Sequence, residues 1–130
     1  MHPYQNRWGE HSIGKDCKIG AYVEIGNDVI IGNNCIIGAY AFLCPGVELQ
    51  DNVFVGPHVV FTNDVYPPST RNWLDTIILE GASIGANCTI LPGITIGKKA
   101  MIGAGSVVTK DVPDGETWVG NPAHKIDKEK

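Results

Sequence analysis

The chain has 130 residues, of which 43% are apolar and 18% charged, a composition typical of one soluble globular domain. Its formal charge of -4, with no cluster of Lys and Arg, argues against a nucleic-acid surface, and no apolar run approaches the roughly 20 residues of a membrane span. We therefore expect a cytoplasmic protein with neither a nucleic-acid nor a membrane partner.

The His and Cys residues show no metal-binding pattern. The four histidines lie far apart, and the four cysteines form no CxxC pair. We expect no metal site, and we expect the thiols to be reduced and buried as small apolar groups.

Residues 1–12 form an N-terminal lead-in without a repeat, and a six-residue period begins at Ile13. One large apolar residue recurs at every sixth position until Phe61, and again from Ile78 to Val108. The fifteen positions are Ile13, Ile19, Ile25, Ile31, Ile37, Leu43, Leu49, Val55, Phe61, Ile78, Ile84, Ile90, Ile96, Ile102 and Val108. Neither a helical period nor a two-residue alternation fits, whereas short strands separated by tight corners do.

Each hexad is thus predicted to be one strand and one turn, and three hexads make a triangular coil of eighteen residues. Fifteen hexads predict an all-β fold, a parallel β-helix over residues 13–113 with about five coils. The first residue of each hexad points inward, so the core is a ladder of aliphatic side chains that no single coil could bury alone.

The period is interrupted once, at residues 65–77, a polar and proline-rich segment that the helix cannot bury. We expect it to project as a loop, and loops on a rigid scaffold often carry function. Stacking of the hexads places His58 one coil below Asn87. It also places Asn63 one coil below Pro92 and two below Lys110. We expect these residues to lie along one edge, which a ligand could follow.

After the last hexad, residues 114–130 are predicted to be a polar C-terminal tail. Three late segments resemble the acyl-CoA-binding end of the hexapeptide-repeat acyltransferases: Gly-Ala-Asn-Cys-Thr-Ile-Leu-Pro-Gly (85–93), Gly-Ala-Gly-Ser-Val-Val-Thr-Lys-Asp-Val-Pro (103–113) and Gly-Asn-Pro-Ala (120–123). The resemblance implies a left-handed β-helix and a homotrimer with sites between subunits. It also implies acetyl-CoA as co-substrate and no metal.

Residues 56–64, Gly-Pro-His-Val-Val-Phe-Thr-Asn-Asp, resemble a narrower branch that N-acetylates nucleotide-linked amino sugars. In that branch an asparagine at the position of Asn63 holds the substrate amine. The O-acetylating branch has a catalytic histidine near the start of the loop, where this chain has Asn63 and Asp64. The resemblance therefore implies transfer to an amine, which already has a free lone pair, whereas a hydroxyl needs a base.

The resemblance implies three catalytic candidates, Asn63, His58 and Asp64. Asn63 orients the amine, and either His58 or Asp64 takes the proton. Alternatively, His58 is a surface residue paired with Asn87, and Asp64 binds the sugar. Backbone amides near Gly85 and Ala86 are expected to stabilise the oxyanion.

Further residues are expected to bind the two substrates. The coenzyme A candidates are Gly85, Ala86, Gly103, Ala104, Thr109, Lys110 and Lys125. The acceptor candidates are Tyr66, Arg71 and Asn87, of which Tyr66 and Arg71 would contact a nucleotide diphosphate. Arg71 and Lys125 can equally be solvated charges, and Pro68 stands where related sequences often have an arginine.

Three other functions compete with this one. An O-acetyltransferase would use His58 as its base. A γ-class carbonic anhydrase needs three zinc-binding histidines, and only His58 is suitably placed. A non-enzymatic β-helix predicts an unbroken flat face of repeated threonines and no projecting loop, and neither is present.

Overall fold

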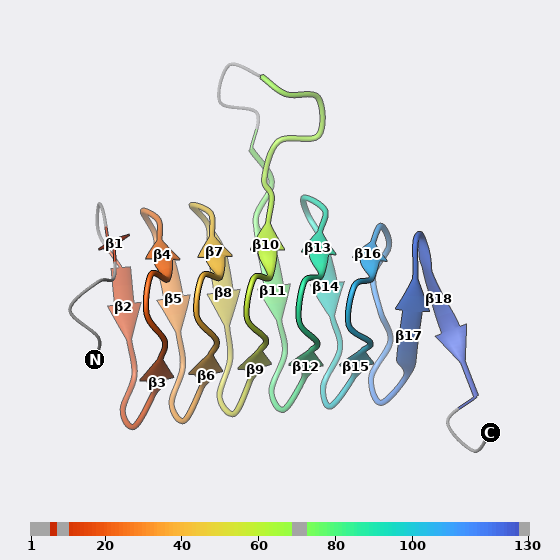
Figure 1. Ribbon diagram of the computed structural model, residues 1–130, viewed down its shortest axis with the longest axis horizontal. Helices are drawn as coiled ribbons and strands as arrows, with labels where there is room; N and C mark the ends of the chain where they lie inside the picture. The colour runs from red at the N-terminus through yellow and green to blue at the C-terminus, as the bar shows by residue number, and fades with distance from the viewer. Residues whose placement is uncertain (1–5, 8–10, 69–72, 128–130) are drawn as a thin grey trace.

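The computed structural model describes residues 6–7, 11–68 and 73–127, which form eighteen strands and no helix (Figure 1). Strands at equivalent places in successive coils pair in parallel, and this described part winds as a left-handed parallel β-helix of about six turns. The predicted fold is confirmed. None of these residues forms a helix that could cross a lipid bilayer.

Three sheets make the walls of the helix. Sheet A contains, in order, β1 (Asn6–Arg7), β4 (Glu24–Ile25), β7 (Phe42–Leu43), β10 (Val60–Phe61), β13 (Thr89–Ile90) and β16 (Val107–Val108). Sheet B contains β2 (His11–Ile13), β5 (Val29–Ile31), β8 (Val47–Leu49), β11 (Thr76–Ile78) and β14 (Thr95–Ile96). Sheet C contains β3 (Lys18–Ile19), β6 (Ile36–Ile37), β9 (Phe54–Val55), β12 (Ser83–Ile84), β15 (Met101–Ile102), β17 (Thr117–Gly120) and β18 (Ala123–Ile126).

Each predicted hexad supplies one strand, from β2 to β16. The first residue of every hexad after Ile13 is buried, and Ile13, at the open end, packs against the core while partly exposed. The predicted columns are also confirmed, since Val55 pairs with Ile84 and Phe61 with Ile90. All four cysteines are free thiols, as expected, and three of them are buried, whereas Cys17 is partly exposed.

In most hexads the fourth residue has the left-handed backbone conformation. Where the residue with this conformation is not glycine, its φ lies between 58° and 66°. Most of these positions carry Asn, Asp or Gly, which tolerate this conformation best. The non-glycine examples are Asp16, Tyr22, Asp28, Asn34, Tyr40, Asn52, His58, Asn87 and Lys99. This residue turns the chain at each corner of the prism.

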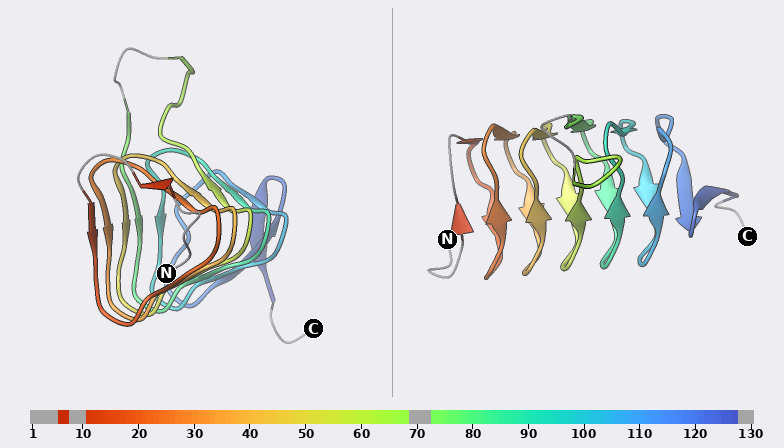
Figure 2. Two further views of the ribbon diagram at one scale, coloured as in Figure 1. Left: turned by 60° about the vertical axis from the view of Figure 1, so that its left-hand side comes forward. Right: turned by 90° about the horizontal axis from the view of Figure 1, so that it is seen from above.

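Two corners matter for function. The C–A corner, which leads from sheet C to sheet A, consists of turns 20–23, 38–41, 56–59, 85–88 and 103–106. The A–B corner, which leads from sheet A to sheet B, consists of turns 26–28, 44–46, 91–94 and 109–111 and of the segment between β10 and β11. The described residues of that segment, 62–68 and 73–75, project from the prism (Figures 1 and 2).

Pairing does not stop at residue 113, where the sequence predicted only a polar tail. Strand β17 adds to β15 in parallel, and β18 folds back on β17 as an antiparallel hairpin. The hairpin covers the edge of sheet C, whose open N–H and C=O groups would otherwise face water.

Candidate functional site

The base of the loop holds Asn63 and Asp64 in place. Asp64 forms an antiparallel bridge with Trp73, and the Leu74 N–H donates to the Asn63 carbonyl at 2.9 Å. On the prism side, the backbone N–H of Thr62 donates to the Ile90 carbonyl at 3.0 Å and its hydroxyl to the same oxygen at 2.9 Å. The residues at this neck are therefore fixed by backbone contacts on both sides.

The amide of Asn63 has a defined orientation. Its Nδ2 donates to the Pro45 carbonyl, one coil below, at 3.2 Å. This contact directs the amide nitrogen toward the prism and leaves Oδ1 to accept a hydrogen bond from a substrate N–H. The arrangement suits a group that presents a donor, such as an amine.

A cavity of about 390 Å³ opens beside Asn63. Its walls are mostly apolar, and they come from sheet A, the A–B corner and the loop. The lining residues are Phe42, Cys44, Pro45, Val60, Phe61, Thr62, Asn63, Asp64, Pro67 and Trp73. We refer to it as the apolar cavity, and its size suits one sugar ring or a planar base.

Cys44 lines this cavity but has no nucleophilic character. The residue is buried, and burial raises the pKa of its thiol to about 12. A thiol with such a pKa carries almost no thiolate at neutral pH, and the thiolate is the reactive form. Burial therefore disfavours covalent catalysis through Cys44 at neutral pH.

A second cavity, of about 740 Å³, lies on the sheet B side of the same corner. It is lined by Asn27, Asp28, Ile30, Pro45, Gly46, Glu48, Trp73, Asp75 and Ile77. Three of these residues are carboxylates, and none of the described lining residues is Lys or Arg. This acidic cavity disfavours a phosphate group.

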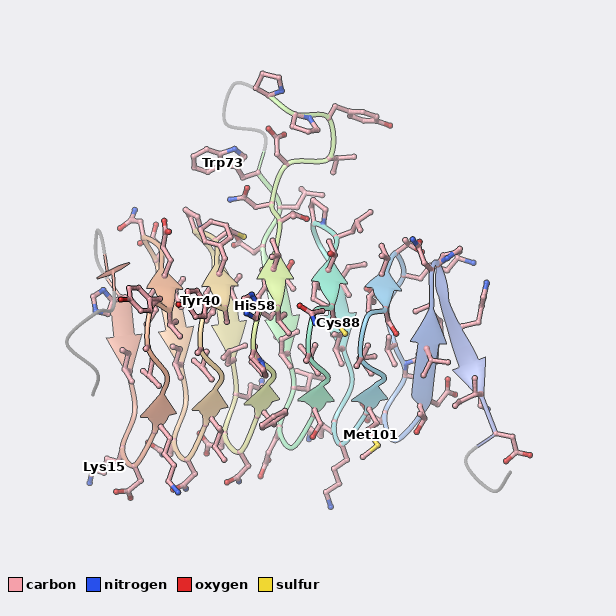
Figure 3. All side chains as sticks on the ribbon, viewed as in Figure 1. Lys15, Tyr40, His58, Trp73, Cys88 and Met101 are labelled. Atoms are coloured by element: carbon pink, nitrogen blue, oxygen red, sulfur yellow. The ribbon has the colours of Figure 1, made fainter. Side chains whose placement is uncertain are left out.

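The C–A corner carries a column of stacked rings. Tyr22 stacks on Tyr40 with ring centroids 5.0 Å apart, and Tyr40 stacks on His58 at 5.0 Å with 6° between the ring planes (Figure 3). Asn87 follows one coil above His58, as predicted, and its N–H donates to the Pro57 carbonyl at 3.0 Å. His58 is therefore an exposed ring in a fixed stack.

The predicted site residues occupy two corners of the chain and not one edge. His58 and Asn87 lie on the C–A corner, with Gly85, Ala86, Gly103 and Ala104. Asn63, Asp64, Thr109 and Lys110 lie on the A–B corner. Five residues of extended chain separate His58 from Asn63, about 16 Å at the rise of a parallel strand. The hexad period predicted the columns correctly, but the prediction that His58 and Asn63 lie along one edge is wrong, because they lie on different corners.

The backbone N–H of Gly85 already has an acceptor in the ladder. This N–H donates to the Ile102 carbonyl at 2.8 Å, and the Gly103 N–H donates to the Trp118 carbonyl at 2.9 Å. The N–H groups of Ala86 and Ala104, by contrast, donate to no acceptor among the described residues. The equivalent amides of Ala21 and Ala39 in the earlier coils also donate to no acceptor among the described residues.

The remaining candidates lie apart from both corners or outside the described residues. Tyr66 is on the loop and is 84% exposed. Lys125 is in β18, with its Nζ 3.6 Å from Glu116 Oε2. Arg71 lies outside the described residues. Sequence reasoning missed Trp73, because no repeat places a loop residue against the prism. It also missed Phe42 and Pro45, which are repeat residues outside the inward column.

The family model for the bacterial transferase hexapeptide (six repeats) matches residues 10–44 and 75–110. No curated protein matches the chain. Among solved structures, GDP-perosamine N-acetyltransferase from Caulobacter crescentus is 26% identical with a TM-score of 0.86, and the match covers 98% of this chain and 56% of that enzyme. The chain thus spans little more than half the length of that relative.

Two further similar structures are an N-acyltransferase and an O-acetyltransferase. AntD, an N-acyltransferase from Bacillus cereus, is 25% identical with a TM-score of 0.84, over 95% of this chain and 77% of that one. A maltose O-acetyltransferase from Clostridium difficile is 31% identical with a TM-score of 0.79, over 90% and 68%. With the family model matching more than half of its residues, this chain belongs to the bacterial hexapeptide-repeat transferases.

Proposed function

We propose that the chain transfers an acetyl group from acetyl-CoA to the amine of an amino sugar, and that the preferred acceptor is a nucleotide-linked sugar. The observation that carries this proposal is the Asn63 amide, whose nitrogen is held by Pro45 and whose oxygen is left for a donor in the acceptor. The structure of GDP-perosamine N-acetyltransferase, a similar protein, holds CoA together with GDP-perosamine.

In the proposed reaction, Asn63 Oδ1 accepts a hydrogen bond from the amine and directs its lone pair. Asp64, the next residue on the same cavity, takes the proton that the nitrogen loses. Acetyl-CoA supplies the acetyl group as a thioester, and coenzyme A leaves as the thiol. The acceptor thus gains an amide bond, and no enzyme nucleophile is needed.

The candidate residues for coenzyme A can bind acetyl-CoA together only if two chains share the site. The open amides of Ala86 and Ala104 can hold a carbonyl oxygen, and Lys110 offers a positive charge to phosphates. Ala86 and Ala104 lie on the C–A corner, however, and Lys110 on the A–B corner. We therefore propose a homotrimer in which the C–A corner of one chain faces the A–B corner of the next.

O-acetylation is the second candidate, because the maltose O-acetyltransferase has the highest identity of the structures described above. It would require His58 as base. Within one chain His58 does not line the cavity that contains Asn63, so it would have to act across the subunit boundary.

The test is the release of coenzyme A thiol with GDP-perosamine, UDP-glucosamine and glucosamine, each compared with its hydroxyl counterpart. We expect release only with the amines. Asn63→Ala should lower kcat/KM by about 100-fold, because a misplaced nucleophile loses its orientation. Asn52→Gly, a control on the third corner, should leave the rate unchanged. Release only with the hydroxyl sugars would overturn the amine assignment.

A further inference from the structure

Trp73 lies between two cavities of opposite character. Trp73 lines both the apolar cavity beside Asn63 and the acidic cavity on the sheet B side, and Pro45 is the other residue that both cavities share. The indole is 49% exposed although it is the largest side chain at the neck (Figure 3). A half-exposed tryptophan at the mouth of a cavity is available to a ligand.

The position of Trp73 is set by the backbone on either side of it. Trp73 bridges Asp64, and the following residue, Leu74, donates its N–H to Asn63. Leu74 also lies over Gly93, where an added Cβ would meet Leu74 Cδ1 at 3.1 Å and Cβ at 3.3 Å. The same hydrogen-bonded neck therefore orients the indole and the amine-binding amide.

From this arrangement we infer that Trp73 is the residue that selects the acceptor. The inference rests on the proposed function and deepens it. The indole closes the apolar cavity, offers a flat apolar face to the acceptor ring, and separates that ring from the carboxylates of the second cavity.

The separation of the acceptor from the acidic cavity matters because of the charges in that cavity. The acidic cavity contains Asp28, Glu48 and Asp75, and the described residues that line it provide no positive charge. A diphosphate exposed to these groups is repelled, more strongly when the site excludes water. With the indole in place, a nucleotide-linked acceptor is shielded from the carboxylates while its sugar ring contacts Trp73.

Removing the indole should join the two cavities. In Trp73→Ala we expect the KM for the acceptor to rise by about tenfold, the loss typical of one aromatic contact, with the KM for acetyl-CoA and kcat nearly unchanged. The loss should be larger for UDP-glucosamine or GDP-perosamine than for free glucosamine, because only the former carry phosphates. Trp73→Phe should recover most of the affinity.

Two controls separate contact from general damage. Trp118→Phe changes a tryptophan whose Nε1 donates to Glu116, far from the loop, and should leave the acceptor KM unchanged. Glu48→Gln added to Trp73→Ala should restore part of the affinity for the nucleotide-linked acceptor and none for free glucosamine. That difference reports charge and would not follow from a folding defect.

The outcomes distinguish the two proposals. If the wild type releases thiol but Trp73→Ala leaves the acceptor KM unchanged, the role of Trp73 is overturned and the proposed function stands. If only hydroxyl sugars react, the amine assignment fails, and the same KM comparison on those sugars decides the role of Trp73. If none of the sugars reacts, both proposals are overturned.

Discussion

At the scale of single residues, the ring column on the C–A corner costs more in backbone strain than the stacking of its rings returns. Tyr22, Tyr40 and His58 all have φ near +60°, a conformation that costs a residue with a Cβ about 1–2 kcal/mol. Each stacked ring pair returns about 0.5–1.5 kcal/mol. The column therefore does not add to stability, and its effect is to hold exposed rings in one orientation beside the open amide of Ala86.

The buried thiols affect stability through their pKa values. Burial raises the pKa values of Cys35, Cys44 and Cys88, and at Cys44 the value reaches about 12 from an ordinary 9.0. Cys35 and Cys88 also donate to carbonyls of Gln50 and Gly103 at 3.1 Å, contacts that only the protonated thiol can make. The folded state therefore keeps these protons more tightly than the unfolded chain does.

This difference predicts a loss of stability at alkaline pH. A raised folded pKa contributes stability that is complete below the unfolded value near 9 and is lost as pH rises toward the folded value of about 12. For Cys44 the free energy of unfolding should fall by about 1 kcal/mol between pH 8 and pH 10. Urea denaturation at both pH values checks this. Cys44→Ala should lose less over the same interval, and an equal loss in both proteins would contradict the account.

At the scale of elements, glycine at the second position of a hexad sets how closely the coils approach at the C–A corner. A Cβ on Gly56 would meet the Ala86 backbone nitrogen at 2.7 Å and its Cα at 2.9 Å. A Cβ on Gly85 would meet Ala104 in the same way, at 2.7 and 2.9 Å. These contacts are with backbone, which cannot move without opening the ladder.

Gly56→Ala should therefore destabilise the protein by about 3 kcal/mol or more, the upper range for forcing extra volume into a packed site. Gly105→Ala is the matched comparison, since nothing lies within 4 Å of an added Cβ there and only the φ of +74° is unfavourable. It should cost about 1 kcal/mol. Urea denaturation of the two variants measures the difference, and equal costs would rule out the proposed clash.

The same elements show what a sequence can predict. Strands β2 to β16 were predictable because one inward apolar residue recurs in every hexad, and burial enforces that position each time. The hairpin β17–β18 was not, because residues 117–126 carry no hexad and pair only to cover an edge. Asn63 was predictable from its motif, whereas Trp73 owes its place to a bridge with Asp64 that leaves no periodic trace.

At the scale of the whole molecule, the proposed site needs residues of both corners, and one chain holds these corners apart. Sheet A separates the C–A corner from the A–B corner, and the loop points away from the prism (Figure 2). The outward residues of sheet A between the corners include Val60, which is 38% exposed, and Phe42, which is partly buried. The same outward column also contains Glu24 and Thr89. In the proposed homotrimer this mixed face lies between the two corners.

Mixing two damaged chains tests this arrangement directly. Asn63→Ala removes the amine contact on the A–B corner, and Ala104→Glu places a negative charge where phosphates of coenzyme A would pass on the C–A corner. Each variant alone should be nearly inactive. When the two are unfolded together in urea and refolded as a mixture, random assembly leaves about one quarter of the sites with both corners intact. Thiol release should therefore recover to about one quarter of the wild-type rate.

The recovery depends on which chains supply the corners. If both corners came from one chain, every chain in the mixture would still carry one damaged corner, and refolding together would restore nothing. A mixture of Asn63→Ala with Asp64→Ala is the control, because both changes lie on the A–B corner and no site escapes one of them. Recovery in that control would show that the two corners do not act as separate halves of one site.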